Sequence, residues 1–122
     1  APNLEGRTLA DLVPAAAGAE DGGVRVAHDL STFRAWESVD AAVVTTSSDL
    51  RLCVPTFRAL LERGLPVVST CEELVWPWLR HAALARDLDD MAKRHGGRLL
   101  GTGVNPGFLM DALPSVLTGV CK

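Results

Sequence analysis

The stretch Pro66-Val67-Val68-Ser69-Thr70-Cys71-Glu72-Glu73 decides the fold class, because a short apolar run leads directly into polar residues. A continuous apolar run of this length predicts a strand that is buried on both faces of a sheet. The same pattern occurs upstream in residues 41–48 (AAVVTTSS) and downstream in residues 98–103 (RLLGTG). We therefore predict three strands, each of which ends in small polar or glycine residues.

Segments with helical spacing separate these strands. The first has apolar residues at positions 54, 57, 60 and 61, and we expect Pro55 at its first helical position and Gly64 at its end. The second covers residues 84–95, and a last helical stretch covers residues 108–120. Parallel strands need such crossovers, which are almost always right-handed. The alternation predicts an α/β fold, a doubly wound parallel sheet with helices on both faces.

Residues 1–40 carry weaker signals. Residues 24–27 resemble a short strand, and residues 31–37 are consistent with a short helix that has Ser31 as its N-cap. Phe33 and Trp36 lie three positions apart, so they can share one face. The length of 122 residues favours a single domain, without an internal repeat or linker.

Composition and charge exclude several classes of partner. The formal net charge of −3 argues against nucleic acid, whose phosphates need a basic face. No apolar run approaches the ~20 residues that cross a bilayer, and residues 1–6 lack the order of a signal peptide. We therefore expect a cytoplasmic protein with no membrane partner, and reduced thiols. No metal site is predicted, because the histidines lack ligand spacing: His28, His81 and His95.

The residues after the strands are the candidates for ligand binding. In an open parallel sheet, ligands bind outside the carboxyl ends of the strands. Hydroxyl groups and free backbone N–H groups there can hold ribose, pyrophosphate or a carboxamide. The alternative is that Ser, Thr and Asn only form turns and helix caps at these places. The predicted cofactor-binding residues are Thr45, Thr46, Ser47, Ser69, Thr70 and Asn105.

The segment from Gly101 to Gly107 (GTGVNPG) follows a strand and opens a helix, so it invites comparison with the dinucleotide fingerprint G-x-G-x-x-G. Pro106 occupies the third glycine position, and Lys122 ends the sequence before the acidic residue expected ~20 positions later. We therefore expect this loop to shape the substrate side of a site rather than to hold a pyrophosphate.

Glu72 and Asn105 are the candidates for chemistry. Glu72 and Glu73 follow the second strand, where one of the two carboxylates can bind an ammonium group or act as an acid or base; the alternative is that they are carboxylates at a helix entry. Asn105 has both a donor and an acceptor, and its alternative role is in a turn. Cys71 is expected to be a buried, inert thiol rather than a nucleophile, since no base is evident beside it.

Two segments, residues 67–74 (VVSTCEEL) and residues 100–108 (LGTGVNPGF), resemble a known family. They are similar to the dihydrodipicolinate-reductase-like NAD(P)-dependent amine dehydrogenases, the 2,4-diaminopentanoate dehydrogenase-like family. Residues 45–48 and 76–81 agree with the resemblance, which covers Gly6 to Cys121. The resemblance implies a Rossmann-type domain that binds NAD or NADP, followed by a separate domain for substrate binding and oligomerisation.

The resemblance also implies how this chain relates to a whole enzyme. Residues 1–122 are expected to be the C-terminal part of the Rossmann-type domain, with its first strand, glycine-rich loop and second strand before Ala1. The implied function is that of a fragment of an oxidoreductase that transfers hydride at a C–N bond of an amine, amino acid or cyclic imine. The full protein is expected to be a homo-oligomer, and this chain alone to be inactive. The alternative is a non-catalytic nucleotide-binding or assembly module with the same fold.

Overall fold

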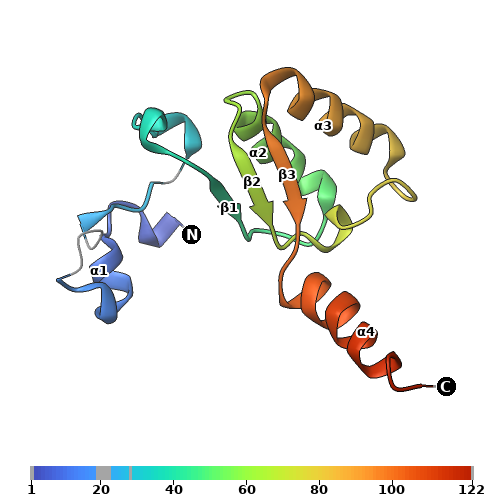
Figure 1. Cartoon of the computed structure of the whole chain (residues 1–122). Helices are drawn as coiled ribbons and strands as arrows, with labels where there is room; N and C mark the ends of the chain where they lie inside the picture. The colour runs from blue at the N-terminus through green and yellow to red at the C-terminus, as the bar shows by residue number, and fades with distance from the viewer. Residues whose placement is uncertain (1, 19–22, 28, 122) are drawn as a thin grey trace. The chain divides into compact units, whose positions relative to one another are not determined.

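The computed structural model describes residues 2–18, 23–27 and 29–121, so His28 lies outside the described residues. The chain divides into two compact units, Ala1–Ser38 and Val39–Lys122. Figure 1 shows the elements along the chain.

The first unit is built from short helical turns around one longer turn, α1 (Leu9–Leu12). Thr8 caps α1, because its Oγ1 accepts from Asp11 N at 3.2 Å while Asp11 Oδ2 accepts from Thr8 N at 2.8 Å. The strand expected at residues 24–27 is reduced to one antiparallel bridge between Thr8 and Arg25. Among the residues that the structure describes, this unit also contains the turns η1 (Pro2–Leu4), η2 (Pro14–Ala16), η4 (Leu30–Thr32) and η5 (Trp36–Ser38).

The N-cap predicted at Ser31 is wrong. Asp29 takes this position, because its Oδ1 accepts from Ser31 N at 2.8 Å, and the N-cap therefore lies two residues earlier than predicted. The expected contact between Phe33 and Trp36 is confirmed: their rings meet edge to face with centroids 4.9 Å apart.

The second unit contains a parallel sheet of three strands in the order β1-β2-β3. These are β1 (Ala42–Val44), β2 (Pro66–Ser69) and β3 (Arg98–Gly101). The register pairs Val44 with Ser69 and Ser69 with Gly101, so the three strands end side by side. The α/β class and the three predicted strands are therefore confirmed.

Two helices connect the strands: α2 (Leu50–Leu61) and α3 (Ala82–His95). The start predicted at Pro55 is wrong, since Asp49 Oδ1 accepts from Arg51 N at 2.8 Å and begins α2 at Leu50. Gly64 and Gly96 adopt positive φ angles of 72° and 73° after the two helices, as their role as helix terminators requires.

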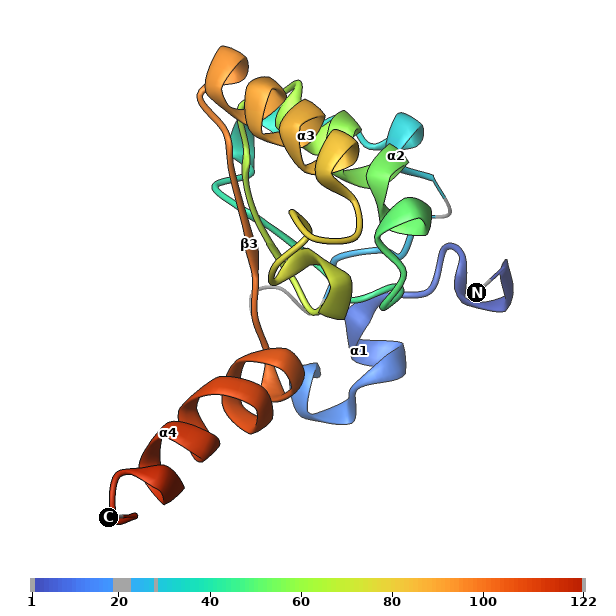
Figure 2. The same ribbon diagram turned by 90° about the vertical axis from the view of Figure 1, so that its right-hand side faces the viewer.

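Both helices pack on the same face of this sheet (Figure 2). Val67 is 1% exposed beneath them, whereas Val43 and Leu100 on the opposite face are 73% and 56% exposed. The three strands lie side by side in the order in which they follow along the chain, and the crossovers between parallel strands all have the same hand. Each connecting helix therefore lies on the same side of the sheet. The expectation of helices on both faces is therefore wrong for the described part of this unit.

The chain leaves the carboxyl end of β3 as a wide helical segment, η7 (Val104–Ala112), and continues directly into α4 (Leu113–Thr118) (Figure 1). Pro114 lies at the start of α4, where the wide helical turn of η7 passes into the α-helix. Within the described ranges, none of the helices has the length and apolarity needed to cross a membrane.

We expect the open sheet face to make the 122-residue chain self-associate. Val43, Val68 and Leu100 form one row across the three strands, and Val43 and Leu100 are exposed. Substituting Val43→Thr and Leu100→Thr should lower self-association in sedimentation velocity without loss of secondary structure. Leu52→Gln is the control, because Leu52 is 69% exposed on α2, away from this face. An unchanged association constant in the double variant would contradict the prediction.

Candidate functional site

Ser69 lies at the end of the central strand and is fully buried. Its hydroxyl donates to the Val44 carbonyl at 2.9 Å and accepts from the Cys71 N–H at 3.1 Å. The backbone N–H groups of Thr70 and Thr102 continue the sheet beyond the strands, with bonds of 3.2 and 2.9 Å to Val44 O and Ser69 O. The Ser69 side chain is therefore occupied by the sheet itself, whereas the Thr70 side chain is exposed.

The polar residues in the loop after β1 also fall into two groups: one is bonded within the loop, and the others have exposed side chains. Ser47 Oγ accepts from Asp49 N at 3.1 Å and so shapes the turn that leads into α2. Thr45 and Thr46 are exposed at the carboxyl end of the sheet, and among the described residues Thr46 Oγ1 makes one long contact, of 3.9 Å, to Cys53 Sγ. The presence of Ser47 is therefore explained by its role in the turn, whereas the hydroxyl groups of Thr45 and Thr46 are accessible to a ligand.

Gly101 is explained by packing. A Cβ atom at this position would lie 3.0 Å from Val75 N and 3.1 Å from the carbonyl carbon of Leu74. A Cβ atom would push β3 away from the turn η6 (Glu72–Leu74), which follows β2, by a few tenths of an ångström, so glycine favours this close approach. The close approach brings the β2 and β3 loops next to each other.

Glu72 and Asn105 meet at this junction, although 33 residues separate them in the sequence. Asn105 Nδ2 donates to Glu72 Oε1 at 2.9 Å, and the backbone of Asn105 is extended (φ −123°, ψ 114°) at the start of η7. Asn105 Oδ1 is buried and has no hydrogen-bond partner among the described residues. The two residues singled out for chemistry therefore form one hydrogen-bonded pair with an unused acceptor.

Glu73 ties together the starts of two helices, which sequence reasoning missed. Its Oε2 accepts from Leu50 N, the first residue of α2, at 3.0 Å and lies 3.1 Å from His81 Nε2. Its own N–H donates to Ser48 O at 3.3 Å. His81 is the residue immediately before α3. No sequence motif predicts this arrangement, because the partners come from three separate segments.

A cavity of about 540 Å³ opens beside Glu72 and Glu73. The cavity is lined by carboxylates from two segments of the chain, by one guanidinium group and by one imidazole ring. Its lining includes Glu72, Trp76, Arg80, His81, Met110 and Asp111. Sequence reasoning named only Glu72 among these as a site residue, since η7 supplies Met110 and Asp111 from far along the chain. A smaller cavity of about 270 Å³ lies between α3, β3 and residues 74–78.

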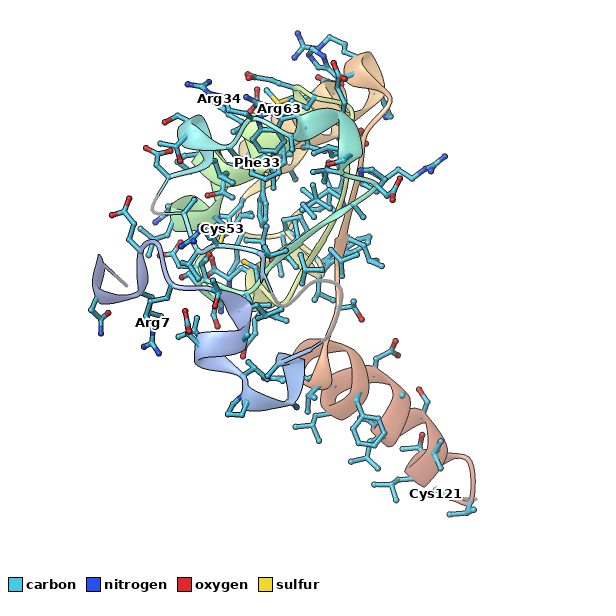
Figure 3. All side chains as sticks on the ribbon, turned by 90° about the vertical axis from the view of Figure 1, so that its left-hand side faces the viewer. Arg7, Phe33, Arg34, Cys53, Arg63 and Cys121 are labelled. Atoms are coloured by element: carbon cyan, nitrogen blue, oxygen red, sulfur yellow. The ribbon has the colours of Figure 1, made fainter. Side chains whose placement is uncertain are left out.

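Two cysteines lie beneath the loop after β1. The thiols of Cys53 and Cys71 donate to the carbonyls of Ser47 and Ser48 at 3.4 and 3.3 Å. Burial, reinforced by the neighbouring Cys53, raises the pKa of Cys71 to about 11. Figure 3 shows Cys53 within the sheet-and-helix unit and Cys121 at the far end of α4. Among the described residues, no group of three His, Cys, Asp or Glu side chains has the geometry of a metal site.

We predict that alkylation distinguishes the three cysteines. Cys121 is exposed, whereas Cys53 and Cys71 are buried and Cys71 has a raised pKa. Iodoacetamide at pH 8 should modify Cys121 alone in the native chain and all three cysteines after denaturation, as measured by peptide mass spectrometry. Rapid native modification of Cys71 would show that it is an accessible, activated thiol.

We also predict that Ser69→Ala destabilises the fold by about 1–3 kcal/mol, because it leaves the buried Cys71 N–H without an acceptor. Thr70→Ala is the matched control: its side chain is exposed, and the change should stay within about 0.5 kcal/mol. The free energies of unfolding come from urea denaturation. Equal effects of the two variants would contradict the structural role of Ser69.

Comparisons with known proteins identify relatives of this chain. No family model matches it. The chain is 34% identical over 103 residues to 2,4-diaminopentanoate dehydrogenase from Acetoanaerobium sticklandii, a match that covers 84% of this chain and 28% of that protein. The structure of an amine dehydrogenase from Mycobacterium smegmatis matches with a TM-score of 0.81 and 29% identity, over 98% of this chain and 34% of that one.

The chain therefore spans about a third of the length of these relatives or less. The sequence identity and the shared fold confirm the resemblance found in the sequence. The chain is homologous to part of 2,4-diaminopentanoate dehydrogenase and to part of an amine dehydrogenase.

Proposed function

We propose that this chain is the C-terminal part of a Rossmann-type, NAD(P)-binding domain in an oxidoreductase that transfers hydride at a C–N bond of an amine, amino acid or cyclic imine. The names of its relatives support this reaction class. The observation that carries the proposal is the Glu72–Asn105 pair, which lies at the carboxyl end of the sheet beside a cavity lined by carboxylates. This is where ligands bind in open parallel sheets.

The residues at this edge fit the nicotinamide end of NAD or NADP. Asn105 Oδ1 is a buried acceptor without a donor, and a carboxamide or an ammonium group supplies the missing N–H. The exposed Thr45, Thr46 and Thr70 offer hydroxyl groups along the same edge. We assign Ser47 and Ser69 to shaping the loops, because their hydroxyl groups are already bonded. When bound, the nicotinamide supplies the hydride chemistry.

Glu72 is the proposed receptor for the substrate nitrogen. The bond from Asn105 Nδ2 fixes the direction of its carboxylate, and Glu72 lines the cavity. A carboxylate in this position binds an ammonium group and can take a proton from it as the amine is oxidised. Glu73 keeps the turn in place by holding Leu50 and His81.

The proposal extends to the setting of the whole protein. Three free cysteines fit a reducing compartment, and we expect the protein to work in the cytoplasm. The exposed apolar row on the sheet fits a larger, homo-oligomeric assembly.

The test uses the longer protein that contains this segment. Glu72→Gln should lower kcat for amine oxidation about 10²–10⁴-fold and change cofactor affinity little, since it removes the base but keeps the shape. Asn105→Ala should reduce turnover by freeing Glu72. Measurements are steady-state kinetics and NADH fluorescence, with the exposed Glu62→Gln as control. Full turnover in Glu72→Gln would refute its role.

The same experiment addresses the alternative function. A protein that binds no nicotinamide cofactor, or that binds one but oxidises no amine, amino acid or cyclic imine, would be a nucleotide-binding or assembly module instead.

A further inference from the structure

Arg80 lies at the edge of the large cavity and forms no ion pair with any other residue that the structure describes. It lies in the loop between η6 and α3 and lines the cavity together with Glu72 and Asp111. The ion pairs between described residues are Arg58–Asp87, His81–Glu73 and Lys93–Asp89, and none includes Arg80. Neither the Arg80 nor the Asp111 side chain has a hydrogen-bond partner in the described part of the chain.

The carboxylates of the cavity are not equivalent. Glu73 is occupied by the Leu50 N–H and by His81. Glu72 is held by Asn105, which leaves its second oxygen available. Arg80 and the carboxylates of Glu72, Glu73 and Asp111 line the same cavity, but Arg80 forms no ion pair with any of these three described residues. The cavity therefore presents both an anionic and a cationic binding group.

The chemistry of a guanidinium sets what Arg80 can bind. Its planar fork of N–H donors matches a carboxylate in a bidentate manner, and it stays charged at all physiological pH values. Apolar side chains, Trp76 and Met110, also line the cavity and suit a hydrocarbon skeleton. A ligand with an ammonium group, a carboxylate and an apolar skeleton between them would use all three features.

We propose that Arg80 is the specificity-determining residue of this cavity. It binds the carboxylate of the substrate while Glu72 receives the ammonium group, so the cavity prefers an amino acid to the amine with the same skeleton. This inference rests on the proposed function for the identity of the site, but its test is a binding measurement and needs neither cofactor nor turnover.

The test compares L-lysine with 1,5-diaminopentane, which differs from it only by the carboxylate. NMR titration of the 122-residue chain should show that L-lysine binds about tenfold more tightly, as expected for one charge-assisted carboxylate contact. Arg80→Gln should remove this preference and leave the affinity for the diamine unchanged. Arg86→Gln is the control, since Arg86 is an exposed arginine on α3 outside the cavity lining.

Arg80→Lys separates charge from geometry. The substituted side chain keeps the positive charge but lacks the planar guanidinium that binds a carboxylate through two N–H groups. This variant should therefore keep only part of the preference for L-lysine over 1,5-diaminopentane. Equal affinities for the two ligands, no binding of L-lysine, or an equal loss for both ligands in Arg80→Gln would overturn the proposal. The dispersion of the NMR spectrum checks that each variant is folded. If the longer protein transfers no hydride, the measured preference for L-lysine remains valid. If the preference for L-lysine is absent, the test of hydride transfer is unaffected.

Discussion

The buried hydroxyl of Ser69 is the interaction on which the functional edge of this structure depends. It accepts the Cys71 N–H and donates to the Val44 carbonyl, so it fixes where the chain leaves the central strand relative to its neighbour. A buried backbone N–H has to find an acceptor, and here a side chain supplies it because the strand has ended. The polar turn that follows, with Glu72 and Glu73, therefore starts from a defined position.

From that position, the turn makes contacts in two directions. Glu73 holds the first N–H of α2 and the His81 ring before α3. Glu72 reaches Asn105 in the loop after β3, and Gly101 provides the room for this approach. Three loops that are distant in sequence thus share one hydrogen-bonded junction. Because the strands are parallel, all of their carboxyl ends lie at the same edge, and this is what makes such a junction possible.

The regular elements of the second unit could be predicted because their patterns are local. The strands around Val43, Val67 and Leu99 follow from short apolar runs, and α3 follows from helical spacing closed by Gly96. The two errors in helix starts arose where two local signals competed. Asp49 began α2 before Pro55, and Asp29 rather than Ser31 began η4, since a carboxylate two residues ahead captured the free N–H.

For the site, the sequence by itself determined the α/β class and placed polar residues after each strand, including Glu72, Thr70 and Asn105. Only the tertiary structure decided which of them are available to a ligand. Ser69 is closed off in the sheet, Glu72 pairs with Asn105, and the cavity combines Glu72 with Arg80 and Asp111. The physical reason is that periodicity along a chain is set by each element's own geometry. Hydrogen bonds and burial between loops depend instead on how the elements pack, which no local pattern encodes.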